Sequence, residues 1–117
     1  MKDYLMLFRN VSGNGDYITT TDDMAEDMPA WQAWIGNIAA QGKLISTQPM
    51  EWTGSVVARE GSSVGPLLST ERHLVAGYLL CKSDNEAEVR GWARSCPIMK
   101  YPQASVEVRG LIPFAAN

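Results

Sequence analysis

The segment from residue 76 to residue 109 constrains the fold most, because it predicts a strand, a helix and a strand in succession. Residues 76–81 form a short apolar run of the kind that builds buried strands. A helix is expected over 84–95, and Pro97 ends it because proline lacks the backbone N–H that a helix needs. The apolar face of this helix consists of Val89, Trp92, Ala93 and Cys96. Residues 104–109 predict the second strand, so the segment forms one half of a small domain of helices and strands.

The first half of the chain predicts the same succession of elements. Residues 4–9 are a dense apolar run that suits a central strand, and 43–48 predict the next main strand. Between them, apolar side chains recur at four-three-four-three spacing, which defines one face of a helix. These side chains are Met24, Met28, Trp31, Ile35 and Ile38. Residues 74–81 complete the set of main strands, with an additional extended piece at 55–60.

Particular residues predict where the helices and turns begin and end. Pro29 should kink or restart the first helix, and Gly42 should end it as a left-handed cap. Ser83 and Glu86 match a capping box for the second helix. Further turns are expected at 52–54, 61–63 and 65–66, where glycine, serine and proline cluster.

The order of these elements predicts an α+β fold in a single domain that spans residues 1–117. It is the ferredoxin-like β-α-β-β-α-β arrangement with an extra hairpin between the middle strands. Right-handed crossovers place both helices on one face of the sheet and leave the other face bare. Strand side chains alternate between faces, so Tyr78, Leu80 and Val106 cannot all point at the helices. A bare, partly apolar face is a liability for a monomer, and we therefore expect a homodimer.

Composition excludes several classes of function. A net charge of −3 argues against broad nucleic-acid binding, which requires an excess of lysine and arginine. Both cysteines, Cys81 and Cys96, fall on predicted apolar faces and are expected to be free packing residues. The first residues lack the pattern of a signal peptide, and the chain has no apolar run long enough to span a bilayer. A cytoplasmic protein without a membrane partner is therefore expected.

Several segments together resemble the YCII-related family, in particular its DGPF branch. The matching segments are 28–44, Val64-Gly65-Pro66-Leu67, Ala76-Gly77-Tyr78, Ala93-Arg94-Ser95-Cys96-Pro97 and Val106-Glu107-Val108-Arg109. The resemblance implies a ferredoxin-like subunit that pairs into a dimeric α+β barrel with a cleft in each subunit. It also implies a link to transcription initiation, because DGPF-type relatives are associated with sigma factors.

The chain departs from the family pattern at the positions that matter for chemistry. Val64 stands where the DGPF motif has its aspartate, and Leu67 replaces the phenylalanine. Some members of the family carry a histidine and an aspartate on the first helix, and here Trp31 and Ala40 occupy those places. Neither side chain can transfer a proton. A hydrolase-like activity based on that pair is therefore not expected.

The other candidates for catalysis or metal binding are few. His73 is the only histidine and hence the best general base by type, although a surface position at the start of a strand is the simpler interpretation. The acidic residues at 22, 23, 26 and 27 could hold a hard cation, but carboxylates are common at helix N-termini for electrostatic reasons alone. No spacing of ligands indicates zinc. We predict no metal and no cofactor.

Aromatic and charged residues suggest an apolar ligand pocket. Trp31 takes a place that lines the cleft in the family that the chain resembles, and Met50 and Trp52 follow the strand that borders it. Such pockets are mostly apolar with a few polar groups. The full predicted set is Trp31, Met50, Trp52, Arg59, Glu60 and Arg109. Glu107 and Arg109 share a strand face, and pairing across the dimer is the more ordinary role for them.

Two functional hypotheses remain open. The first is a non-enzymatic homodimer that binds a small apolar or aromatic ligand or a partner protein linked to sigma factors. Direct reading of DNA is not expected, given the acidic balance and the lack of a recognition helix. The second is a cofactor-free oxygenase or isomerase of the dimeric α+β barrel type, with His73 as the base.

Overall fold

The computed structural model describes residues 1–11, 21–51, 53–66 and 73–114. Side chains at the edges of these ranges, at residues 11, 21–24, 66 and 73, are outside the description. The elements are β1 (Lys2–Val11), α1 (Thr21–Ala40), β2 (Leu44–Pro49), β3 (Thr53–Ala58), β4 (Gly61–Pro66), β5 (His73–Ser83), α2 (Glu86–Arg94), the 3₁₀ helix η1 (Pro97–Lys100) and β6 (Ser105–Gly110). This confirms the expected β-α-β-β-α-β order and the extra hairpin.

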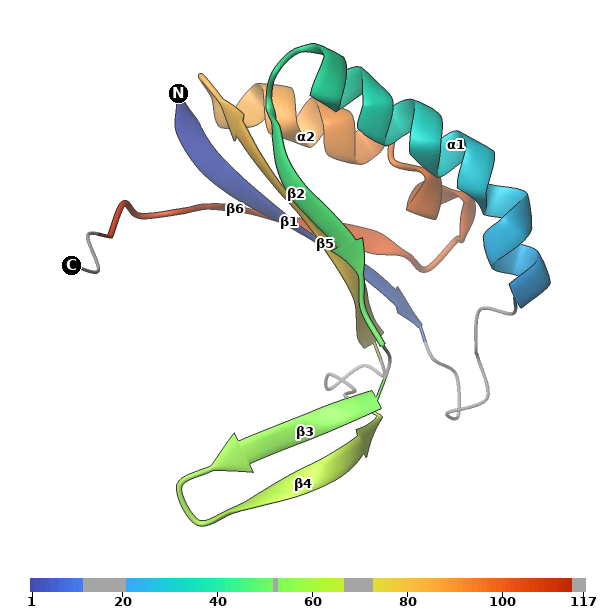
Figure 1. Cartoon of the computed structure of the whole chain (residues 1–117), viewed down its shortest axis with the longest axis vertical. Helices are drawn as coiled ribbons and strands as arrows, with labels where there is room; N and C mark the ends of the chain where they lie inside the picture. The colour runs from blue at the N-terminus through green and yellow to red at the C-terminus, as the bar shows by residue number, and fades with distance from the viewer. Residues whose placement is uncertain (12–20, 52, 67–72, 115–117) are drawn as a thin grey trace.

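The main sheet has four strands in the order β2-β5-β1-β6, and all neighbouring strands are antiparallel. Both α-helices lie on one face of this sheet, as Figure 1 shows. Strands β3 and β4 pair only with each other among the described strands, and their hairpin projects from the end of β2 away from the main sheet (Figure 1). The architecture is α+β and compatible with a ferredoxin-like fold.

The core lies between the sheet and the helices. Strand side chains alternate between the two faces, so Tyr4, Met6 and Phe8 of β1 and Leu79 and Cys81 of β5 point toward the helices. The buried core residues are Tyr4, Met6, Phe8, Trp34, Ile38, Leu79, Cys81, Val89, Ala93, Cys96 and Ile98. Met6, Leu79 and Val89 have no exposed surface, and burial of each such side chain contributes about 1.5–3 kcal/mol. Val106 also packs against this core.

Helix α1 runs unbroken through Pro29, so the helix does not restart there, and the alternative expectation of a kink stays a prediction. The proline is exposed, while Trp34 and Ile38 in the following turns are buried against the sheet. This packing holds the second half of α1 on the sheet despite the missing hydrogen bond.

The prediction for Gly42 is confirmed, because its φ is 72° and its N–H donates to Ala39 O at 2.9 Å. The N–H of Lys43 donates to Ile38 O at 3.3 Å, which completes a Schellman cap.

Helix α2 begins later than the sequence predicts, and the expected capping box is wrong. Asn85 is the N-cap, and its Oδ1 accepts the N–H of Glu88 at 2.9 Å. Ser83 is instead the last residue of β5, fully buried, with its Oγ 2.6 Å from Glu88 Oε1. The Nζ of Lys43 donates to both carboxylate oxygens of Glu88, at 2.8 and 2.9 Å. These contacts fasten α2 to the start of β2 and the end of β5.

The projecting hairpin also differs in detail from the sequence expectation. Thr53 and Gly54 belong to β3 and do not form a bend, and the expected turns at 61–63 and 65–66 are part of β4. Pairing of Ala58 with Gly61 places the turn at residues 59–60. Gly61 and Gly65 have φ values of 139° and 147°, which side-chain-bearing residues rarely adopt. The glycines therefore mark irregular strand positions. Trp52, predicted at the bend, lies outside the described residues.

Gly77 allows β2 and β5 to approach closely at the end of the sheet that lies next to the β3–β4 hairpin. An ideal Cβ built on this residue would lie 2.9 Å from Gln48 O and 3.2 Å from the Cα of Pro49. Beyond this point the ladder ends with the N–H of Met50, which donates to Ala76 O at 2.8 Å. The segment that resembles the family motif Ala-Gly-Tyr therefore has a structural reason for its glycine.

Candidate functional site

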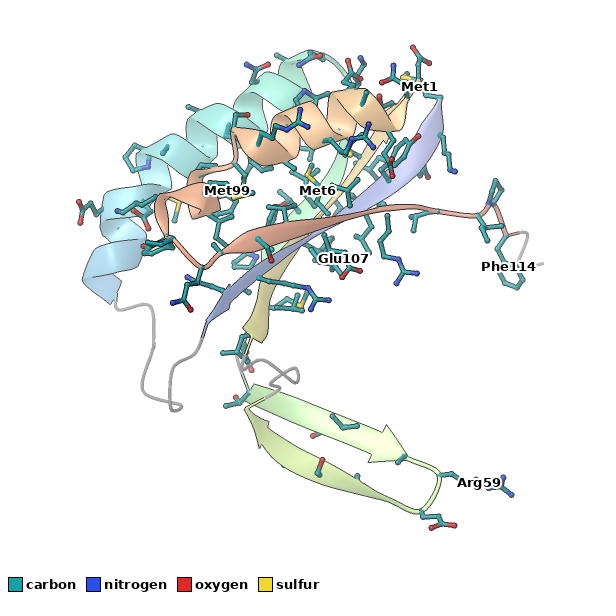
Figure 2. All side chains as sticks on the ribbon, turned by 180° about the vertical axis from the view of Figure 1, so that it is seen from behind. Met1, Met6, Arg59, Met99, Glu107 and Phe114 are labelled. Carbon is teal, nitrogen blue, oxygen red and sulfur yellow. The ribbon has the colours of Figure 1, made fainter. Side chains whose placement is uncertain are left out.

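The face of the main sheet opposite the helices is covered by no described helix or strand, and we call it the open face. The strand register arranges most of its side chains in three rows: two run across β2, β5, β1 and β6, and the third runs across β5, β1 and β6. The first row is Ser46, Leu80, Leu5 and Arg109; the second is Gln48, Tyr78, Leu7 and Glu107; the third is Val75, Arg9 and Ser105. Figure 2 shows Glu107 on this side of the sheet, whereas Met6 lies on the side of the helices.

The middle of the open face is apolar and its two edges are polar. Leu5, Leu7 and Leu80 form the middle together with Tyr78, and all four are partly buried by their neighbours. On the β2 edge, Ser46 Oγ and the Tyr78 hydroxyl lie 2.8 Å apart and form a hydrogen bond. An apolar strip with a few polar groups beside it is the usual composition of a small-molecule site.

The β6 edge of the open face carries two guanidinium groups and one carboxylate. Arg9 Nη2 donates to Glu107 Oε1 at 2.7 Å, and the two side chains are 27% and 33% exposed. Arg109 Nη1 lies 3.7 Å from Glu107 Oε2, and the Arg109 side chain is 69% exposed. The Nε of Arg9 is buried and has no hydrogen-bond partner. The cluster therefore has more hydrogen-bond donors than acceptors.

His73 is the first residue of β5, and its backbone pairs with Val11 of β1. This register position is two residues beyond Val75, the partner of Arg9. The description does not extend to the His73 side chain, so its role as a base stays a prediction.

The predicted ligand residues that the structure describes do not come together within one chain. Trp31 packs edge-to-face against Phe8 and Trp34, with ring centroids 5.1 and 5.7 Å apart, on the helix side of the sheet. Arg109 lies on β6 at the open face. Met50 follows β2 and is 41% exposed, and Trp52 is outside the described residues.

The other two predicted ligand residues lie still further away. Arg59 and Glu60 form the exposed turn of the β3–β4 hairpin, which Figure 2 places well away from the main sheet. A single pocket that includes all the predicted residues is therefore not formed by this chain alone. Their role in ligand binding stays a prediction.

Sequence reasoning missed Arg9, Tyr78 and Ser46 as members of a site. The dense apolar run 4–9 predicts a central strand, and within it Arg9 follows Leu5 and Leu7 at the two-residue spacing of one strand face. That spacing was the available signal. The pairing of Arg9 with Glu107, which lie 98 positions apart, required the strand order.

A second charged cluster joins α1 to η1. Lys100 Nζ and the Tyr101 hydroxyl each donate to a different carboxylate oxygen of Asp27, both at 2.5 Å. These hydrogen bonds, first that of Lys100 and then that of Tyr101, lower the pKa of Asp27. The cluster fastens the first half of α1 to the segment that follows α2, and a structural role accounts for it.

Cys81 and Cys96 are buried and free, as predicted. Burial raises the pKa of the Cys81 thiol to about 11 and that of Cys96 to about 12. Neither thiol is therefore an activated nucleophile at neutral pH.

Among the residues that the structure describes, histidine, cysteine, aspartate and glutamate form no group of three or more that could hold a metal ion.

Comparisons with known proteins support the fold and do not identify a family. No protein-family model matches the chain, and no curated protein sequence matches it. The structure is similar to that of 5-chloro-2-hydroxyhydroquinone dehydrochlorinase (TftG) from Burkholderia phenoliruptrix AC1100, solved in complex with 2,5-dihydroxybenzoquinone. The TM-score is 0.55 at 13% sequence identity, over 92% of this chain and 90% of that chain. None of the described helices has the length and apolar character needed to cross a membrane.

Proposed function

We propose that this protein is a homodimer whose subunits pack through their open faces and that the enclosed space binds a small aromatic ligand. The observation that carries the proposal is the apolar strip of Leu5, Leu7, Tyr78 and Leu80, which no described element covers. A sheet with one bare apolar face gains stability when a second layer packs on it. A second copy of the chain supplies that layer.

The charged edge of the open face suits a symmetric partner. In a two-fold dimer the same patch of both chains forms the interface. If one residue contacts a second residue of the partner, the second residue of the first chain also contacts the first residue of the partner. Arg9, Glu107 and Arg109 lie together on one sheet face, which allows one arginine of each chain to pair with the partner's Glu107 and the reverse. The patch is thus apolar at its centre and allows reciprocal ion pairs at its edge, where Arg9 and Arg109 outnumber the carboxylate of Glu107.

Two resemblances support this proposal. The YCII-related, DGPF-like sequence pattern implies a dimeric α+β barrel, and the fold found here is compatible with the ferredoxin-like subunit of such a barrel. The similar solved structure holds a quinone, which is a small, flat ring compound. An aromatic ligand suits the strip better than a sigma-linked protein does, because a stable protein interface needs about 1,000 Å² or more and the second copy already occupies the open face.

The proposal is tested by mass and by ligand-dependent melting of the full chain. Light scattering after size-exclusion chromatography should give the mass of a dimer at micromolar concentration. A panel of hydroquinones, quinones and benzoic acids should then include compounds that raise the melting temperature, since a ligand that binds only the folded form stabilises it. A monomer at all concentrations would refute the dimer, and a panel without any stabilising compound would refute the aromatic ligand.

A cofactor-free enzyme is the second candidate. The observation that favours it is the backbone position of His73, two residues beyond the row that contains Arg9 and Val75. An oxygenase or isomerase that acts on the same aromatic ligand would use His73 as its base. Turnover of a stabilising compound that is lost in His73→Ala, with melting unchanged, supports the enzyme. Equal turnover in this variant eliminates His73 as the base.

A further inference from the structure

Among the described residues of the open face, positive charge exceeds negative charge. Asp3 and Lys82 are cross-strand partners at one end of the face and balance each other. At the β6 edge, Arg9 and Arg109 share the single carboxylate of Glu107. Each chain therefore presents one uncompensated guanidinium beside the apolar strip.

The donors of these guanidinium groups are largely unused. A guanidinium carries five N–H groups and no acceptor. Arg9 makes one hydrogen bond among the described residues, to Glu107, while its buried Nε has no partner. Within the described part of the chain, Arg109 pairs with Glu107 Oε2 at 3.7 Å, which is too long for a hydrogen bond. Arg109 therefore retains a full set of donors next to Leu5, its cross-strand neighbour.

Pairing of the two β6 edges with each other does not remove this excess of positive charge. The inference rests on the proposed dimer, in which two open faces bring together four guanidinium groups and two carboxylates from this edge. Exchange of ion pairs across the two-fold axis changes which groups are paired and leaves the net charge of these six groups unchanged. Enclosing an uncompensated charge away from water is unfavourable unless an opposite charge accompanies it.

We propose that the enclosed site selects aromatic anions, meaning a ring that bears one ionised oxygen group such as a carboxylate or a phenolate. The ring would lie on the strip of Leu5, Leu7, Leu80 and Tyr78, and the ionised group would accept hydrogen bonds from Arg109. Arg9 holds Glu107 in place by its 2.7 Å hydrogen bond and leaves Arg109 available to the ligand.

Benzoate and benzamide provide a matched pair of probes, since they share ring and size and differ in charge. Thermal melting of the full chain is followed as each probe is titrated at low ionic strength, with acetate as the anion that lacks a ring. Benzoate should bind at least about tenfold more tightly than benzamide, because a hydrogen bond to a charged group is worth more than a neutral one. Acetate should shift the melting temperature less than benzoate does, because it leaves the apolar strip empty.

Three variants assign the preference to Arg109. Arg109→Gln should bind both probes equally, and Arg109→Lys should keep part of the preference because it keeps the charge. Arg94→Gln, an exposed arginine in the last turn of α2, is the matched control and should behave like wild type. If Arg109→Gln is monomeric, the Arg109→Lys dimer shows in the same assay whether Arg109 carries the preference for benzoate over benzamide.

The outcomes separate this inference from the proposed dimer. A wild-type dimer that binds benzoate no better than benzamide overturns the anion site and leaves the dimer standing. An undiminished preference in Arg109→Gln, or its complete loss in an Arg109→Lys dimer, overturns the role of Arg109. A monomeric wild-type chain in light scattering refutes the dimer itself, and the anion site with it.

Discussion

Replacing Leu7 by serine tests whether the open face is the dimer interface. Leu7 lies in the middle row of that face, between Tyr78 and Glu107. Full burial of a leucine side chain contributes about 1.5–3 kcal/mol. Leu7 is already partly buried within one chain, so dimerisation adds about 1 kcal/mol per copy. A two-fold interface contains the residue twice, which gives about 2 kcal/mol and a dimer dissociation constant weakened about 30-fold.

Sedimentation velocity over a dilution series measures this change. Far-UV circular dichroism of the same samples checks that Leu7→Ser is folded. Met28→Gln is the control, because Met28 is an apolar residue with 45% exposure on α1, at the helix side of the sheet. The control should dissociate as wild type does. A folded Leu7→Ser protein that dissociates at the wild-type concentration would refute the placement of the interface.

Three further predictions concern stability and reactivity. Gly77→Ala should lower the free energy of unfolding in urea by about 1–3 kcal/mol, because the added Cβ would overlap the backbone of β2. The control Gly91→Ala should raise it by about 0.5–1 kcal/mol, because a Cβ at this mid-helix position meets nothing within 4 Å. Equal effects of the two substitutions would contradict the close approach at Gly77. The thiols of Cys81 and Cys96 should resist iodoacetamide at pH 8 until urea unfolds the chain, because burial raises the pKa of Cys81 to about 11 and of Cys96 to about 12. Their contribution to stability is fully present below the unfolded pKa of about 9 and is lost as pH rises through the raised pKa values of the folded state. The melting temperature of a Cys81→Ala/Cys96→Ala chain should therefore depend less on pH above 9 than that of wild type. A stronger dependence in the variant would contradict this prediction. Hydrogen bonds from Lys43 and then Ser83 lower the pKa of Glu88, so its stabilisation is present above the ordinary glutamate pKa and is lost on acidification through the lowered value. Glu88→Gln should accordingly lose less melting temperature than wild type below pH 4, and parallel acid profiles would disprove this.

Local features of the chain that depend on near neighbours were predicted well. Apolar alternation and helical spacing located all main strands and both α-helices within a few residues, and Gly42 was recognised as a cap. The errors occurred where pairing with a distant strand decides the outcome. Pairing with Lys2 of β1 extends β5 to Ser83, and the residue that would cap α2 on local grounds becomes part of a strand.

The candidate site was predicted less well, for a related reason. Arg109 was recognised, but the residues grouped with it fall on the helix side of the sheet, at Trp31, and on the distant hairpin turn, at Arg59 and Glu60. Nothing in the linear order of the chain indicates that Arg9 and Glu107 share an edge of one face.

By itself, the sequence determined the identity and order of the elements, because helical and strand periodicity and capping are local properties of the chain. It also determined that one face of the sheet would lack helices, because crossovers in such units have one hand. The tertiary structure alone decided the strand register, and with it the three rows of the open face and the excess of guanidinium over carboxylate at its β6 edge. Register depends on contacts between residues far apart in the chain, and these exist only once the sheet has formed.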